Sequence, residues 1–115
     1  FGAGTVLNHK TAHSQIMGAI VMGIGAGLLE SVHYDERRGR PVNRNLADYL
    51  VPVNPDVPPI DCDFVEEKDT RINPLGVKGV GELGITGVGA AIANAVFHAT
   101  GKRVRKLPVM IEMLL

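Results

Sequence analysis

A glycine-rich apolar stretch near the start of the chain restricts the possible folds most. From Ile16 to Leu29 the sequence reads IMGAIVMGIGAGLL, with glycines at 18, 23, 25 and 27. Its apolar residues recur at helical spacing, and Thr11 or Ser14 can cap a helix that ends near Leu29 or Glu30. Each glycine costs an isolated helix about 1 kcal/mol relative to alanine. Such a helix is useful only where neighbouring backbone comes very close, so we expect it to cross another element tightly.

The remaining periodic segments predict a second helix and a hairpin. An alanine-rich helix is expected from about Thr86 to Thr100, and Gly101 is a natural residue to end it. Ser31–Asp35 alternates like a strand, and Pro41–Asn43 follows a turn as its expected hairpin partner. These elements predict an α+β fold with two helices rich in glycine and alanine and with short strands.

The middle and the end of the chain add two further strand predictions. Ile60–Val65 alternates apolar and acidic residues, which predicts a half-buried strand that includes Cys62 as a small hydrophobic residue. Val104–Leu107 is expected to form another short strand. Four prolines predict an ordered, irregular connection before the first of these segments: Pro52, Pro55, Pro58 and Pro59.

Composition limits the classes of protein. With 115 residues, 45% of them hydrophobic, the chain has enough apolar material for one modest core, so one domain is expected. Twelve basic residues balance twelve acidic ones, which argues against a nucleic-acid partner. Glycines interrupt the apolar run from 16 to 29, and we expect no segment to reach the length of a membrane span.

Candidate metal ligands are few. His9 and His13 are spaced i, i+4 and would share a helix face, but no third ligand accompanies them at a suitable spacing. The single Cys62 lies in no CxxC or Cys/His pattern. We therefore predict no metal site formed by this chain alone.

A second glycine-rich stretch, GVKGVGELGITG from Gly76 to Gly87, contains one acid, Glu82. Glycines let backbone N–H groups press against a ligand, so this loop can present a lone base to a bulky cofactor. A flexible surface turn with an incidental glutamate explains the pattern equally well. Gly79–Gly84 also matches GxGxxG, but a dinucleotide fingerprint needs a buried strand directly before it and an acid about 20 residues beyond. Neither is present.

The order of several motifs resembles a known family. NPLGVKGVGELG at Asn73–Gly84 is followed by AAIANAV at Ala90–Val96 and by ATGKRVRKLP at Ala99–Pro108. GAIVMGIG at Gly18–Gly25 and NLADY at Asn45–Tyr49 agree. Together they resemble the C-terminal end of the molybdenum-binding subunit of the xanthine dehydrogenase and aldehyde oxidoreductase family, over nearly the whole chain.

The aldehyde oxidoreductase type fits best. Small residues follow the KGVGE element here, whereas bovine-type xanthine oxidases have a proline where this chain has Leu83. The resemblance implies that residues 1–115 form the C-terminal part of a molybdenum-cofactor-binding domain. The chain begins at Phe1 without an initiator methionine, and family subunits are several times longer, so we expect a fragment that is inactive alone.

The resemblance also implies roles for individual residues. Glu82 matches the active-site glutamate that acts as general base beside the molybdenum. Gln15 matches a glutamine that reaches the pterin end of the cofactor, although an ordinary polar residue in the first helical turn explains it without the family. The segment flanking the base is expected to line the same pocket: Lys78, Gly79, Val80 and Gly81.

A larger assembly is implied as well. The family holds a molybdopterin-type molybdenum cofactor, in some members the cytosine dinucleotide form, and oxidises aldehydes or aromatic heterocycles with water as the oxygen source. Electrons leave through iron–sulfur clusters and FAD on partner subunits or domains. The expected partners are therefore the remainder of the molybdenum subunit and iron–sulfur and FAD-binding subunits. The competing hypothesis is a non-enzymatic binding or structural domain that keeps the scaffold without the cofactor.

Overall fold

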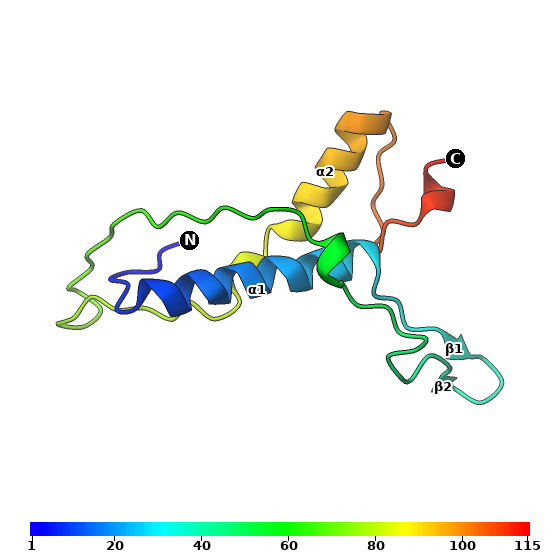
Figure 1. Cartoon of the computed structure of the whole chain (residues 1–115), viewed down its shortest axis with the longest axis horizontal. Helices are drawn as coiled ribbons and strands as arrows, with labels where there is room; N and C mark the ends of the chain where they lie inside the picture. Colours follow the sequence, from blue (N-terminus) through cyan, green and yellow to red (C-terminus); the bar gives the residue numbers. More distant parts are fainter.

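A single long helix organises the chain. The computed structural model describes all residues, 1–115, and Figure 1 shows α1 as a spine with the hairpin at one end and the chain's N-terminal segment at the other. In chain order, the elements are α1 (His9–Leu28), β1 (Tyr34–Asp35), β2 (Arg40–Pro41), η1 (Asn54–Asp56), η2 (Leu83–Ile85), α2 (Val88–Thr100) and η3 (Ile111–Met113). The α+β prediction is confirmed.

Both predicted helices form, with one start displaced. Asn8 caps α1, because its Oδ1 accepts a hydrogen bond of 3.1 Å from the Thr11 N–H. The predicted caps at Thr11 and Ser14 are therefore wrong, since Asn8 already satisfies a free donor of the first turn. α2 ends as predicted: Gly101 takes φ 72, and its N–H donates to the Phe97 carbonyl at 2.7 Å.

The hairpin is confirmed, in a shorter form than predicted. Tyr34 pairs with Pro41 and Asp35 with Arg40 in an antiparallel register. The buried Asn43 fastens the base of the hairpin, because it accepts from the His33 N–H at 2.9 Å and donates to the Ser31 carbonyl at 2.6 Å.

The two other predicted strands are wrong. Ile60–Val65 alternates between half-buried and exposed residues as expected, but it has no neighbouring strand with which to pair. It runs as an extended segment back along α1 (Figure 1), where Phe64 meets the His9 ring edge-on at a centroid distance of 5.9 Å. Val104–Leu107 likewise has no strand partner, although Val104 is buried. The alternation of apolar and polar residues here indicates which side chains are buried. A β-ladder also needs a second strand, which this chain does not supply.

The tight crossing predicted from the glycines exists. A Cβ placed on Gly23 would lie 2.5 Å from the Cβ of Val88 in α2, and one on Gly27 would lie 2.5 Å from the Ile92 Cδ1. On the other side of the contact, a Cβ on Gly84 in η2 would lie 2.9 Å from the Ile16 carbonyl oxygen. Gly18 has no atom within 4 Å, so the close-approach argument fails at that glycine.

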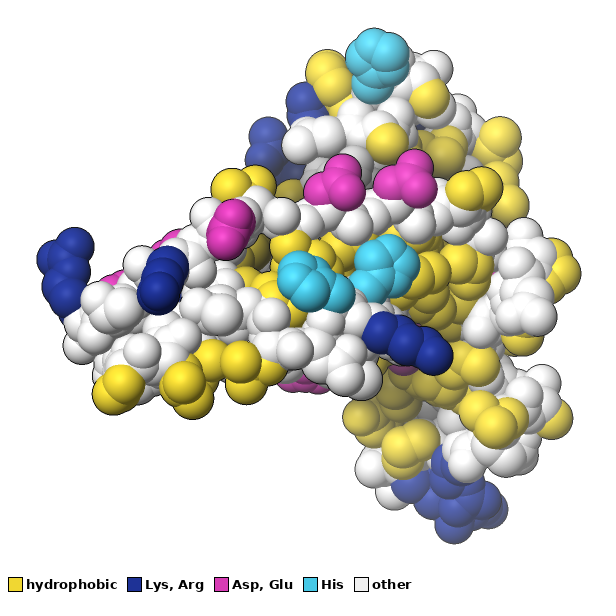
Figure 2. Space-filling view, turned by 60° about the vertical axis from the view of Figure 1, so that its left-hand side comes forward, with side chains coloured by type: hydrophobic (Ala, Val, Ile, Leu, Met, Phe, Trp, Pro, Cys, Tyr) yellow, Lys and Arg dark blue, Asp and Glu magenta, His cyan; other side chains and the backbone are white.

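The expected single core is not formed. Only four hydrophobic side chains are buried, namely Ala12, Ala19, Val104 and Val109, and all four are small. The accessible surface is 8676 Å², whereas a compact monomer of 12.3 kDa exposes about 6,100 Å². The radius of gyration is 17.9 Å, against about 13 Å for a compact chain of this length. Hydrophobic side chains spread over the visible face in Figure 2, so large apolar areas remain uncovered within this chain.

One segment exceeds the sequence expectation for membrane spans. Leu83–Thr100 is long and apolar enough to cross a membrane by length and composition, which corrects the prediction that no segment reaches that length. In the structure a turn at Thr86 and Gly87 separates η2 from α2. The 13 residues of α2 give about 20 Å of helix, shorter than the roughly 30 Å of a bilayer's hydrocarbon core.

Candidate functional site

The loop from Gly76 to Glu82 is tied firmly where it begins. Gly4 and Val77 form an antiparallel bridge, and the Thr5 N–H donates to the Gly76 carbonyl at 2.8 Å. The Asn73 side chain accepts from the Val77 N–H at 3.1 Å and donates to the Val77 carbonyl at 2.8 Å. These contacts fix the backbone at the entrance to the glycine-rich run.

Glu82 lies where the loop meets η2. Its carbonyl accepts from the Ile85 N–H at 3.2 Å, and η2 packs closely on α1 through Gly84. The carboxylate is exposed and makes no hydrogen bond or ion pair within the chain. A backbone held by η2 therefore carries a carboxylate with no partner in the chain, which leaves it free to accept a proton.

Gln15 reaches the same place from α1. Its Nε2 donates to the carbonyl of Gly81 at 3.1 Å, across 66 positions of sequence. The structure thus brings two of the predicted site residues together, Gln15 and Gly81, and Gly81 directly precedes Glu82. The contact is with the loop backbone, so Gln15 holds the loop in this structure.

The backbone between these anchors offers free donors. The main-chain N–H groups of Gly79, Val80, Gly81 and Glu82 donate to no acceptor in the chain. Gly79 and Gly81 have no atom within 4 Å of a Cβ position, and Gly81 takes φ 41, which other residues rarely adopt. Val80, Lys78 and Gln15 also line a cavity of about 360 Å³ together with the start of α1. This edge therefore has free donors and open space for a polar group.

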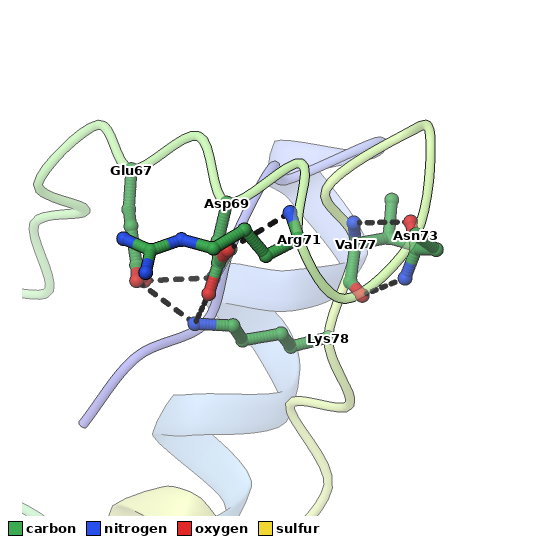
Figure 3. Close-up of polar contacts among 7 residues, drawn as sticks. Glu67, Asp69, Arg71, Asn73, Val77 and Lys78 are labelled. Carbon is green, nitrogen blue, oxygen red and sulfur yellow. Dashed lines mark hydrogen bonds and ion pairs between the residues drawn. The ribbon is translucent and has the colours of Figure 1, made fainter.

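Lys78 contributes its backbone to the loop and its side chain to an ion cluster. Figure 3 shows its side chain pointing between two carboxylates: Nζ lies 2.8 Å from the Glu67 Oε1 and 3.4 Å from the Asp69 Oδ2. The hydrogen bond to Glu67 raises the pKa of Lys78, and that from Lys78, helped by the Gly4 N–H, lowers the pKa of Glu67. The backbone of Lys78 borders the loop, and its ammonium is already paired with Glu67 and Asp69.

Sequence reasoning missed the acidic partners and Asn73 as part of this site. The run Glu66-Glu67-Lys68-Asp69 is a visible charge cluster, but no spacing rule relates it to Lys78. The histidines contribute no metal centre, because no group of three or more His, Cys, Asp or Glu residues could hold an ion. His9 opens α1 and packs on Phe64.

Comparison with known proteins identifies the family. Residues 1–58, half of the chain, match the family described as the molybdopterin cofactor-binding domain. The chain belongs to this family. The resemblance predicted from the sequence motifs is thereby confirmed.

Individual relatives agree. The aldehyde oxidoreductase molybdenum-binding subunit PaoC of Escherichia coli K12 is 50% identical over 98% of this chain and 15% of its own length. The 6-hydroxypseudooxynicotine dehydrogenase complex subunit gamma of Paenarthrobacter nicotinovorans is 42% identical over 97% of this chain and 14% of its own. The crystal structure of quinoline 2-oxidoreductase from Pseudomonas putida 86 superposes with a TM-score of 0.82 at 34% identity, over 96% of this chain and 14% of that one. The chain thus spans about 15% of the length of the curated relatives that it matches.

Proposed function

We propose that this chain is part of a molybdenum hydroxylase that oxidises aldehydes or aromatic heterocycles with water as the oxygen source. In this proposal residues 1–115 are the C-terminal part of the cofactor-binding domain, and Glu82 is the general base. The observation that carries it is the free carboxylate of Glu82 on a backbone pinned by η2 and by Gln15. The names of the relatives, which include an aldehyde oxidoreductase subunit, support the substrate class.

The bound molybdopterin-type cofactor would supply the redox chemistry, accepting two electrons from the substrate. The chain's own contribution is proton transfer and positioning. A carboxylate oxygen of Glu82 would accept the proton of the oxygen nucleophile as that nucleophile attacks the substrate carbon. Such proton transfer typically contributes about 10²–10⁴-fold to the rate. The free N–H groups of Gly79, Val80 and Gly81 would donate to the polar edge of the cofactor, and Gln15 would hold their loop in place.

Partners follow from the same proposal. The surface exceeds that of a compact monomer by roughly 2,600 Å², an area on the scale of a large permanent interface. The remainder of the molybdenum subunit would cover much of it, and iron–sulfur and FAD-binding subunits would carry the electrons away. The cofactor's cytosine dinucleotide form is one variant of this proposal.

A non-enzymatic scaffold domain without cofactor is the competing function. It explains the loop as an exposed turn whose N–H groups and carboxylate bond to water, whereas the enzyme hypothesis gives them a ligand. Metal analysis of the full-length protein separates the two, because stoichiometric molybdenum is expected only for the enzyme.

The decisive experiment is Glu82→Gln in the full-length protein within its complex. The amide keeps the size of the side chain and loses the ability to accept a proton, so turnover should fall by at least about 10² with molybdenum content unchanged. Rapid kinetics of reduction by substrate should locate the loss in the chemical step. Glu112→Gln is the matched control, because Glu112 is an exposed acid in η3 with no polar contact. Near-normal turnover of Glu82→Gln at full molybdenum loading would show that Glu82 is not the base.

A further inference from the structure

An ion cluster joins three segments that are distant in sequence. Lys78 belongs to the loop that leads to Glu82, while Glu67 and Asp69 come from the preceding turn (Figure 3). Glu67 uses both oxygens, since Oε1 accepts from Lys78 at 2.8 Å and Oε2 accepts from the Gly4 N–H at 3.2 Å. The N-terminal segment, the acidic turn and the loop therefore meet at one carboxylate.

The cluster is partly sheltered from water. The Lys78 side chain is 20% exposed, against 40% for Glu67 and 29% for Asp69. Two negative charges and one positive charge leave a net charge of −1, which repels a phosphate or another anion. An ammonium in this setting serves poorly as a ligand for an anionic cofactor.

The path from this cluster to Glu82 is short, and few contacts support it: the Val80 carbonyl accepts from the Leu83 N–H at 3.1 Å, and Gln15 holds the Gly81 carbonyl. Lys78 precedes Glu82 by four residues, and the intervening N–H groups make no bonds within the chain. Between the Val77 bridge and η2, the only side chains with polar contacts that hold the loop are Lys78 on one side and Gln15 on the other. Loss of either anchor should let the Glu82 carboxylate drift.

We propose that the Lys78–Glu67–Asp69 cluster positions the base loop, and that Lys78 acts through Glu82 as a positioning residue instead of binding the cofactor. This inference rests on the proposed function of Glu82. It gives the Lys78 side chain a role that the observed contacts carry, in addition to the expected place of its backbone beside the cofactor pocket.

The test is a double-mutant cycle in the full-length protein within its complex. Lys78→Met should lower turnover by roughly 10-fold, and by up to about 10²-fold, since a displacement of about 1 Å has an effect of that size. Molybdenum content and KM should stay near those of the unmodified protein. Lys78→Arg, which can bridge the same two carboxylates, should recover most of the rate. Lys68→Met is the control, because Lys68 is exposed, lies in the same acidic turn and forms no ion pair.

The cycle separates positioning from general damage. If Lys78 acts through Glu82, Lys78→Met should have almost no further effect on turnover in a Glu82→Gln background. An equal loss in both backgrounds, or a loss of molybdenum in proportion to the rate, would overturn the proposal in favour of a structural or a cofactor-binding lysine.

A readout without activity distinguishes this inference from the proposed function. Hydrogen exchange at the amides of Thr5 and Val77, which donate bonds at the loop entrance, should be faster in Lys78→Met than in Lys68→Met. If exchange is faster in Lys78→Met but Glu82→Gln keeps normal turnover, the cluster anchors the loop and Glu82 is not the base. Unchanged exchange would sink the cluster's role whatever Glu82 does.

Discussion

The crossing of α1 with α2 and the loop before Glu82 are stabilised by different kinds of interaction. At the crossing, glycines at 23 and 27 let Val88 and Ile92 press directly on the α1 backbone. At the loop, carboxylates, an ammonium and side-chain amides make specific polar contacts. The crossing depends on shape, and the loop depends on charge and hydrogen bonding.

This difference divides scaffold from site. Apolar close packing responds to changes of volume and hardly to pH or salt. A partly exposed ion cluster is weaker, and it is sensitive to both. Mutations at the crossing should therefore act on stability, while mutations at the loop should act on turnover.

The largest effect, on cofactor binding and activity, is expected when the 115 residues are studied in isolation. The isolated 115 residues should bind no molybdenum cofactor and have no oxidase activity, because neither region is covered and few side chains are buried. Metal analysis of the purified chain checks this. Stoichiometric molybdenum in that sample would show that the chain completes a site by itself.

At the crossing, Gly23→Val should destabilise the full-length subunit by about 1–3 kcal/mol, the usual effect of overpacking. A Cβ there meets Val88 at 2.5 Å, so the side chains must move. Gly18→Ala is the matched control: it has open space and should stabilise α1 by roughly 0.5–1 kcal/mol. Thermal unfolding of both variants gives the comparison. A loss for Gly18→Ala as large as that for Gly23→Val would mean that other protein packs on Gly18.

Gln15→Ala should have a smaller effect, confined to the site. It removes the bond to the Gly81 carbonyl, whose net value is about 0.5–1.5 kcal/mol, so a change of about tenfold at most is expected. Reduced cofactor occupancy or an altered molybdenum spectrum would report it. Ser14→Ala, an exposed neighbour without a polar contact, provides the control. Unchanged turnover, occupancy and spectrum would leave Gln15 as an ordinary helix residue.

The smallest effect is a pH dependence of the loop alone. Lys78 and the Gly4 N–H lower the pKa of Glu67 from its ordinary value of 4.5. The contribution of Glu67 to the stability of the loop is therefore complete above pH 4.5. It is lost as the pH falls through the lower folded-state pKa. The pKa of Lys78 is raised above 10.5, so its contribution is complete below 10.5 and is lost at still higher pH. Both side chains are partly exposed, and solvent weakens the effect.

Hydrogen exchange at Thr5 and Val77 should accelerate toward acid pH, beyond the intrinsic chemical dependence, before α1 is affected. Glu67→Gln should remove that dependence. If the α1 amides and the loop amides lose protection together, the two regions do not differ in the way described.

The sequence predicted what depends on local pattern. Gly101 ended α2 as expected, because a left-handed residue after an alanine-rich helix needs no tertiary information. The start of α1 was missed, since Asn8, Thr11 and Ser14 are all acceptable caps and only the fold selects one. The strand at 60–65 was wrong because a strand is a property of two segments. The acidic partners of Lys78 were missed for the same reason, since they lie nine and eleven positions away with no periodic relation.

The bridge between Gly4 and Val77 has a consequence for the order of folding. Contacts around the loop join positions separated by 63 and 66 residues, whereas the backbone hydrogen bonds of α1 and the hairpin join near neighbours. Closing such long intervals costs entropy before any contact repays it, so non-local contacts form slowly. We expect α1 and the hairpin to appear early in refolding and the segment carrying Glu82 to be among the last parts to settle. During synthesis, the loop that carries Glu82 would then take its final form only after α1 and the hairpin have folded.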